Sequence, residues 1–214
     1  MKCLVTAGPT FEPLDEVRRL TNFSTGRLGS QLAAWLAARG HDVTLLLGHY
    51  ATWRGGAGAA EVRTFTTAND LSDQLHRLAA PEVGAVFHAA AVGDFCLAGA
   101  YERLPDGRLA EIKESKIASR RACVLLELKP APKIIASLRD WYPSARLIGW
   151  KYELEGGREA ALAGARRQLT ECRTDACVVN GRAYGEGFGL ARPDTPDVHC
   201  ADQETLFDAL AGLL

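Results

Sequence analysis

The amino-acid sequence predicts an α/β fold with a doubly wound, mostly parallel sheet and helices on both faces. Short apolar runs alternate with amphipathic helical patterns, which is the order of βαβ units. Residues 83–92 are almost wholly apolar, as expected of a strand buried on both faces. No linker or internal repeat divides the 214 residues, so we expect one domain over 1–214.

The composition is that of an ordinary globular protein. Apolar residues make up 47% and charged residues 24%, which excludes a disordered or fibrous chain. The 25 basic and 26 acidic side chains nearly cancel, so the net charge predicts no nucleic-acid partner. No apolar run approaches the roughly 20 residues that span a bilayer, and the N-terminus lacks a secretory pattern. We therefore expect a cytoplasmic protein with no membrane partner.

Hydrophobic periodicity and capping signals predict the individual elements. The first helix is expected to begin near Gly29, and the second has Thr67 as its N-cap with Asp70 three residues on. Pro132 is expected at the first position of a third helix. Leucine stripes predict two further helices, at 162–172 and 206–213. The expected strands are 2–6, 42–47, 62–65, 83–92, 123–128, 146–150 and 176–179.

Residues 93–122 interrupt this alternation. They form a polar, basic stretch without a helical pattern, and we interpret them as a flap. Lys113, Lys116, Arg120 and Arg121 lie within nine residues that hold a single acid. Such a run is either a solvated face or a group of cations that meets an anion, and its composition does not decide between them.

Polar and charged side chains collect directly after the expected strands. In a doubly wound sheet, ligands bind outside the carboxyl ends of the strands, where the strand order reverses. We therefore expect these loops to share one edge and to form one site. The candidates are Arg18, Asn22, Ser24, Gly26 and Gly29 after the first strand, Asp94, Lys113 and Lys116 after 83–92, Lys151 after 146–150, and Asn180 after 176–179.

The segment 22–29, Asn-Phe-Ser-Thr-Gly-Arg-Leu-Gly, fits an anion site. Small hydroxyl residues and glycines before a helix expose backbone N–H groups beside the positive end of the helix dipole. The segment is not a Walker loop, and its glycines do not fit Gly-x-Gly-x-x-Gly. The pattern is compatible with phosphate binding and with an ordinary capped helix start.

Other candidates also have two interpretations. Asp94 can hold a metal-bound phosphate or cap a turn, and Asn180 is a turn former at a strand end. His88 lies in an apolar strand and is interpreted as a core histidine. The six cysteines lack the spacing of a zinc site, so we expect reduced structural thiols. No serine–histidine or cysteine–histidine spacing predicts a protein nucleophile.

Several motifs, in chain order, resemble those of phosphopantothenoylcysteine synthetases. Each motif is weak alone, but the colinear set covers about the whole chain. The motifs are Thr6-Ala7-Gly8-Pro9-Thr10, Glu12-Pro13-Leu14-Asp15, Val17-Arg18, the segment 22–29, 89–95, Lys116-Ile117, 128–133, 148–153, Val179-Asn180 and Gly187-Phe188-Gly189.

The resemblance implies a Rossmann-like fold, a homodimer with the flap crossing between subunits, and a ligase of coenzyme A biosynthesis. Enzymes of this family bind 4′-phosphopantothenate and ATP or CTP with Mg²⁺. They form an acyl-nucleotidylate with loss of pyrophosphate, which the amine of L-cysteine then attacks. Because cysteine brings its own amine, the absence of a predicted protein nucleophile agrees with this chemistry.

The resemblance also implies roles for particular residues. Lys116 is expected to act in catalysis with Asn22 and Arg18, because activating a carboxylate brings two anions together. Asp94 is expected beside the metal. Nucleotide binding is expected at Gly8, Ser24, Gly26, Gly29, Asp94, Lys133, Trp150, Lys151 and Asn180, and substrate binding at Arg18, Asn22, Ala90 and Ala91.

Two stretches depart from the bacterial members of the family. Ala-Pro-Lys at 131–133 stands in place of Asn-Pro-Asp, and Trp-Lys-Tyr-Glu-Leu at 150–154 in place of Phe-Ala-Ala-Glu-Thr. Both resemble stand-alone, eukaryote-type enzymes, which favours ATP. Residue 1 already begins the synthetase-like strand, so decarboxylation is not expected.

Two alternatives come from other classes of protein. The departures leave open a non-catalytic nucleotide-binding paralogue. Thr25, Gly26 and Gly29 in a doubly wound pattern also suggest an NAD(P)-dependent short-chain-type reductase. That class needs a tyrosine with a lysine four places on, and no tyrosine of this chain has one.

Overall fold

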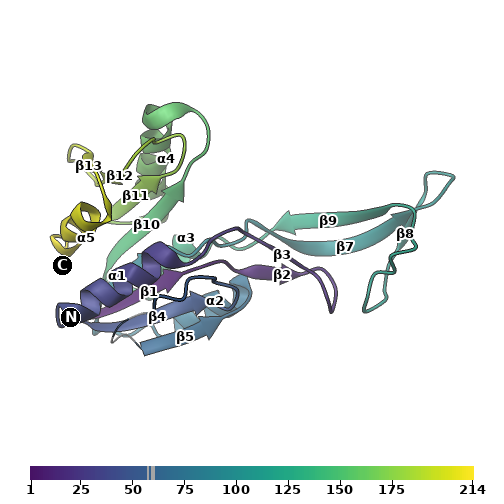
Figure 1. The fold of residues 1–214 in the computed structure, drawn as a ribbon, viewed down its shortest axis with the longest axis horizontal. Coiled ribbons are helices and arrows are strands. Elements are labelled where there is room, and N and C mark those ends of the chain that lie inside the picture. Colours follow the sequence, from purple (N-terminus) through teal and green to yellow (C-terminus); the bar gives the residue numbers. More distant parts are fainter. Residues whose placement is uncertain (57, 59–60) are drawn as a thin grey trace.

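The computed structural model describes residues 1–56, 58 and 61–214 (Figure 1). The strand–helix units that the sequence predicts are present, with additional strands between them. The strands are β1 (Lys2–Ala7), β2 (Phe11–Pro13), β3 (Arg19–Thr21), β4 (Asp42–Gly48), β5 (Glu61–Phe65), β6 (Val83–His88), β7 (Phe95–Arg103), β8 (Leu109–Glu111), β9 (Val124–Pro130), β10 (Arg146–Tyr152), β11 (Ala176–Asn180), β12 (Phe188–Ala191) and β13 (Val198–Cys200). The helices are α1 (Arg27–Ala38), α2 (Ala68–Arg77), α3 (Ile134–Trp141), α4 (Gly157–Cys172) and α5 (Gln203–Ala211).

An eight-stranded sheet forms the centre of the fold, in the order β13-β12-β11-β10-β6-β1-β4-β5. Pairing is parallel from β11 to β5, and β12 and β13 add an antiparallel edge that the sequence did not predict. Numbered along the chain, the parallel strands lie in the order 3-2-1-4-5-6, which is that of dinucleotide-binding folds. The predicted doubly wound α/β fold is confirmed.

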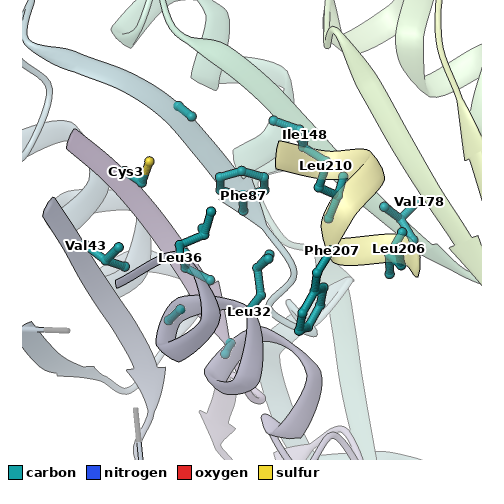
Figure 2. Packing of buried hydrophobic residues seen from close by; sticks show 14 of the residues in the cluster. Cys3, Leu32, Leu36, Val43, Phe87, Ile148, Val178, Leu206, Phe207 and Leu210 are labelled. Atoms are coloured by element: carbon teal, nitrogen blue, oxygen red, sulfur yellow. The ribbon is translucent and has the colours of Figure 1, made fainter. Parts of the chain in front are cut away.

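Helices cover both faces of this sheet and bury its core. Leu32 of α1 and Leu210 of α5 lie in one cluster with Phe87 of β6, and Figure 2 shows Phe87 facing both helices. On the opposite face, Leu71 of α2 and Leu138 of α3 belong to a second cluster. Burying one such side chain contributes about 1.5–3 kcal/mol, so these apolar stripes fix the helices on the sheet.

The ends of the helices follow local sequence signals in most cases. The Thr67 side chain accepts a hydrogen bond from the backbone N–H of Asp70 at 3.1 Å, so the predicted cap of α2 is confirmed. The prediction that Pro132 is the first residue of the third helix was wrong by two residues. Helix α3 begins at Ile134 with Lys133 as its N-cap, so Pro132 precedes the helix.

An antiparallel arm projects from the central sheet along the longest axis of the molecule (Figure 1). It is a separate three-stranded sheet in the order β8-β7-β9. The stretch 93–122, interpreted as a flap without a helical pattern, contains two strands, β7 and β8, that the sequence analysis did not predict. The strand expected at 123–128 exists as β9, but it pairs with β7 and not with the parallel sheet. Several of its apolar residues, Val124, Leu126 and Leu128, are exposed on the arm.

The connection between β1 and α1 contains a short hairpin. Strands β2 and β3 pair antiparallel, with Phe11 opposite Thr21. This hairpin extends beside the base of the arm (Figure 1). Within the described ranges, no helix has both the length and the apolar composition that crossing a membrane requires.

Candidate functional site

The loops after β1 and β6 lie side by side at the point where the strand order reverses. The backbone N–H of Ala91 donates to Gly8 O at 2.9 Å, and that of Thr10 donates to Ala91 O at 3.2 Å. Strand β6 therefore ends at His88 and not at residue 92, because residues 89–92 leave the sheet to follow the loop after β1. This position is where doubly wound folds bind their ligands.

A buried threonine–histidine pair at the ends of β1 and β6 supports the loops that follow these two strands. Thr6 Oγ1 lies 3.0 Å from His88 Nδ1 and accepts a hydrogen bond from the backbone N–H of Ala90 at 3.1 Å. Burial lowers the pKa of His88 from 6.5 to about 4, so the imidazole is neutral at physiological pH. The interpretation of His88 as a core histidine is confirmed, and the pair also fixes the backbone at Ala90.

Acidification should destabilise the fold through His88. The unfolded chain takes up the proton near pH 6.5 and the folded chain only near pH 4, so this stability is present above pH 6.5 and is lost as the pH falls towards 4. The loss should reach about 3 kcal/mol, measured as the free energy of unfolding in urea at several pH values. The variant His88→Asn should have a flatter profile, and His76→Gln, which changes an exposed histidine, should not. Equal pH profiles for wild type and His88→Asn would contradict this role.

Glycines from the end of β1 and the start of α1 pack together at the carboxyl ends of β1 and β4. Gly8 and Gly26 have φ values of +81° and +77°, which disfavour other residues. A Cβ on Gly26 would lie 3.3 Å from Gly8 Cα, and a Cβ on Gly29 would lie 2.6 Å from Ala7 Cβ. A side chain at Gly29 would push α1 away from β1, and a Cβ on Gly8 or Gly26 would crowd Ala51 Cβ, at 2.9 and 3.0 Å.

These contacts explain why the glycine motif was not visible in the sequence. Gly8 ends the first strand, Gly26 is the N-cap of α1, and Gly29 allows α1 to pack closely on β1. They occupy the places that the glycines of a dinucleotide-binding loop occupy, but the β2–β3 hairpin is inserted between the first two. The N-terminus of α1 then presents backbone N–H groups that lack an intrahelical partner, with half-buried Ser24 just before it. We call Gly8, Gly26 and Gly29 the glycine cradle.

A cavity of about 270 Å³ lies next to the loop that follows Gly8, and its largely apolar lining includes two of the candidates, Asn22 and Asp94. Asn22 Nδ2 donates to Ala91 O at 3.1 Å and to Val92 O at 3.4 Å. Asp94 is exposed, and the backbone before it is held by a hydrogen bond from the N–H of Gly93 to Thr10 Oγ1 at 2.8 Å. The structure therefore brings Asn22 and Asp94 together with the backbone at Ala91 and Val92, whereas the backbone of Ala90 is bound by Thr6.

Four further candidates lie around β10 and β11, on both faces of the sheet. Trp150 is on the α1 face, and its buried Nε1 has no hydrogen-bond partner in the described part of the chain. Lys151 points to the opposite face, where its Nζ lies 3.3 Å from Glu153 Oε1 and where Lys133 begins α3. Asn180 ends β11, and its carbonyl accepts from the backbone N–H of Glu153 at 2.9 Å. Alternation along β10 thus separates Trp150 from Lys151.

Arg18 and Lys116 lie away from the cradle within one chain. Arg18 is near the tip of the β2–β3 hairpin, where its Nη1 lies 2.6 Å from Asp15 Oδ2 and donates to Ile117 O at 3.0 Å. Lys116 is exposed on the segment that this hairpin contacts. The expectation that all of the candidate loops share one edge therefore does not hold for these two cations.

The thiols have a structural environment. All six cysteines are free, and Cys3 and Cys177 are among those that are buried. Burial raises the pKa of Cys3 to about 11 and that of Cys177 to about 12, so these thiols are poor nucleophiles at neutral pH. Among residues 1–56, 58 and 61–214, no group of three or more His, Cys, Asp or Glu side chains could hold a metal ion.

Sequence reasoning missed residues that hold the site without belonging to a ligand motif. Thr6 and Thr10 stand in one of the quoted motifs but were given no role. Gly48 was also missed, although a Cβ there would lie 2.3 Å from Pro9 O. A signal existed only for Asp15, whose spacing from Arg18 suits a local ion pair.

The fold and the site define an α/β protein of the Rossmann-like class, with a glycine-lined helix N-terminus at the reversal of strand order. The chain belongs to the family described as "DNA/pantothenate metabolism flavoprotein C-terminal domain", which matches residues 1–206. The family resemblance inferred from the motifs is thereby confirmed.

Curated relatives include the coenzyme A biosynthesis bifunctional protein CoaBC of two organisms. The Thermococcus kodakarensis protein is 31% identical over 185 residues, 86% of this chain and 42% of the relative. The Mycobacterium tuberculosis protein is 34% identical over 200 residues, 90% of this chain and 44% of the relative. The chain therefore spans less than half the length of these relatives.

Solved structures show the same fold. The DNA/pantothenate metabolism flavoprotein from Streptococcus pneumoniae has a TM-score of 0.84 at 25% identity and covers 100% of both chains. A Cab2 variant in complex with phosphopantothenate-cysteine has a TM-score of 0.74 at 18% identity, over 99% of this chain and 85% of that chain. At that identity the likeness concerns the fold alone. These matches favour neither the reductase nor the non-catalytic alternative.

Proposed function

We propose that this chain is a ligase of coenzyme A biosynthesis, which joins 4′-phosphopantothenate to L-cysteine through an acyl-nucleotidylate. The observation that carries this proposal is the glycine cradle beside the Asn22–Asp94 cavity. The cradle suits the phosphates of a nucleotide, and the cavity offers polar groups to a second substrate. Family membership and the names of the CoaBC relatives support it.

The proposed reaction has two steps. A carboxylate oxygen of phosphopantothenate attacks the α-phosphorus of the nucleotide, and pyrophosphate leaves. The amine of cysteine then attacks the acyl carbon, loses a proton, and releases the nucleoside monophosphate. In the first step two anions approach each other, so the N–H groups at the start of α1 and the Lys116 cation would offset the charge. In the second step Asn22 would hold the acyl intermediate beside the 91–92 carbonyls.

The residues at the cavity fit the Mg²⁺ that the family resemblance implies. Mg²⁺ is usually bound through one or two carboxylates together with substrate phosphates and waters, not by a complete protein cage. Asp94 is an exposed carboxylate on the cavity, and Glu12 also lines it. Mg²⁺ bound there would neutralise phosphate charge, and Asp94 would hold it.

We further propose ATP as the nucleotide and a homodimer as the working form. The stretches 131–133 and 150–154, which resemble eukaryote-type enzymes, support ATP. Apolar residues on one face of the arm support the dimer: Leu97 pairs with Leu128, and Phe95, Leu126 and Leu128 are 40–49% exposed. In such a dimer the flap of one copy would bring Lys116 towards the cavity of the other. Light scattering would measure the mass in solution.

The test of this function is pyrophosphate release by the purified chain. Phosphopantothenate and cysteine would be supplied with Mg²⁺ and either ATP or CTP, with each substrate omitted in turn. We expect turnover that depends on the acid and is faster with ATP. No pyrophosphate with either nucleotide would overturn the proposal.

Replacing Asn22 by alanine should slow the cysteine step more than the nucleotide step. The two contacts from Asn22 Nδ2 to backbone carbonyls place its side chain at the mouth of the cavity. Losing one oriented hydrogen bond should slow product formation about tenfold and let the acyl-nucleotidylate accumulate. Quenched-flow samples analysed by mass spectrometry would measure the intermediate. Product formation at the wild-type rate would remove Asn22 from this role.

A further inference from the structure

The tip of the β2–β3 hairpin makes a charged contact with the flap. Asp15 Oδ1 accepts hydrogen bonds from the backbone N–H groups of Val17 at 2.8 Å and Arg18 at 2.7 Å. Asp15 Oδ2 accepts from Arg18 Nη1 at 2.6 Å and from the backbone N–H of Ile117 at 3.1 Å. Arg18 Nη1 also donates to Ile117 O at 3.0 Å. The ion pair therefore binds both backbone polar groups of Ile117.

The same contact fixes the backbone on both sides of Lys116. The backbone N–H of Glu16 donates to Ser115 O at 2.9 Å, on the residue before the lysine. The side chain of Ile117, on the residue after it, is buried with Ala100 of β7. Lys116 thus stands, with its own side chain exposed, between two residues that are held by the hairpin and the arm.

Asp15 differs from an ordinary surface carboxylate. Its side chain is 2% exposed, whereas that of Arg18 is 43% exposed. Desolvation by burial opposes its charge, but backbone hydrogen bonds from Val17, Ile117 and Arg18, together with the Arg18 charge, lower its pKa below the usual value. An enclosed carboxylate that accepts several hydrogen bonds can order two segments, which an exposed ion pair seldom does.

We propose that Asp15 is a positioning residue, which joins the hairpin tip to residues 115–117 and so sets the places of Arg18 and Lys116 together. The hydrogen bonds from Asp15 and Arg18 to Ile117 are sufficient to infer that the two segments are joined. The consequence for catalysis rests on the proposed function, because that function gives the two cations their roles. Asp15 would act only through these neighbours.

Hydrogen exchange tests the joining without any assay of the ligase. In Asp15→Ala, the amide of Ile117 loses its acceptor, and its exchange should become about tenfold to a hundredfold faster, along with that of Glu16. Asp15→Asn keeps an acceptor oxygen but not the charge, so exchange of the Ile117 amide in this variant should be faster than in wild type and slower than in Asp15→Ala. The matched control is Asp106→Ala. Asp106 accepts from the backbone N–H of Arg108 at 3.0 Å and from its Nε at 2.7 Å, in a turn of the arm.

Kinetics then test the consequence for the reaction. With Asp15→Ala, KM for phosphopantothenate should rise about tenfold and kcat should fall, because Arg18 and Lys116 are no longer held together. KM for the nucleotide should stay unchanged, because the glycine cradle contacts neither Arg18 nor Lys116. Asp15→Asn should recover part of the loss, and Asp106→Ala should match wild type. A purely structural role would lower the unfolding midpoint, but it would not raise KM for phosphopantothenate while leaving KM for the nucleotide unchanged.

The outcomes separate this inference from the proposed function. Unchanged exchange at Ile117 in both Asp15 variants would overturn the joining, whatever reaction the protein catalyses. Faster exchange with unaltered kinetics in an active enzyme would overturn the positioning role. A wild type without ligase turnover would overturn the proposed function instead, and the exchange comparison would still decide whether Asp15 joins the two segments.

Discussion

Replacing Lys116 by alanine should slow pyrophosphate release by about a hundredfold or more. The first step brings a carboxylate to a triphosphate, and a preorganised cation offsets the charge that develops between them. Lys116 is exposed on the flap segment that the hairpin holds, so its removal should leave the core intact. Steady-state kcat, together with the thermal unfolding midpoint, would measure both effects.

Lys113 provides the matched control for this substitution. It lies on the same flap and is also exposed, but its Nζ lies 3.2 Å from Glu111 Oε2. Lys113→Ala should keep nearly full activity, and Lys116→Arg should keep part of it because the charge remains. Equal rates for Lys116→Ala and wild type would remove Lys116 from the reaction.

Replacing Gly29 by alanine should both destabilise the protein and abolish tight nucleotide binding. The added Cβ would meet Ala7 Cβ at 2.6 Å and Thr6 O at 3.1 Å, so α1 must move away from β1. Overpacking of this kind costs about 1–3 kcal/mol, which lowers the unfolding midpoint of a chain of this size by several degrees. Calorimetric unfolding would measure the loss, and equilibrium titration with ATP would measure binding.

Gly164 separates this effect from helix propensity. It also lies within a helix, but a Cβ there would meet only flexible side-chain atoms, at 3.5 Å and beyond. Gly164→Ala should therefore be neutral or stabilising by up to about 1 kcal/mol. If Gly29→Ala unfolds at the wild-type midpoint and still binds nucleotide, the close packing of α1 on β1 does not build the site.

Local signals predicted the elements and much of the core. The hydroxyl of Thr67 and the leucine spacing of α2 depend on neighbours a few residues away, and both were confirmed. The same reasoning failed where tertiary contacts override local preference. Residues 89–92 are as apolar as a strand, but they bond to the loop after β1, and β9 leaves the central sheet for the arm.

The candidate site was only partly accessible to sequence reasoning, for a geometric reason. A motif in the chain can be read when its residues are contiguous, as with the segment 22–29. Gly8 and Gly26 form one cradle across an inserted hairpin, and Asp15 meets Ile117 across a much longer separation. Local patterns mark Gly26 in the segment 22–29 and the spacing of Asp15 from Arg18, but no local pattern indicates that Gly26 meets Gly8 or that Asp15 meets Ile117.

The inserted hairpin has a consequence for the order in which the molecule folds. Joining Gly8 to Gly26 closes a loop whose entropy cost is about 2–3 kcal/mol. The β2–β3 pairing and the docking of α1 onto β1 and β4 must offset this cost, so we expect the cradle to be among the last parts to form. An anion bound there should accordingly slow unfolding and leave the refolding rate almost unchanged.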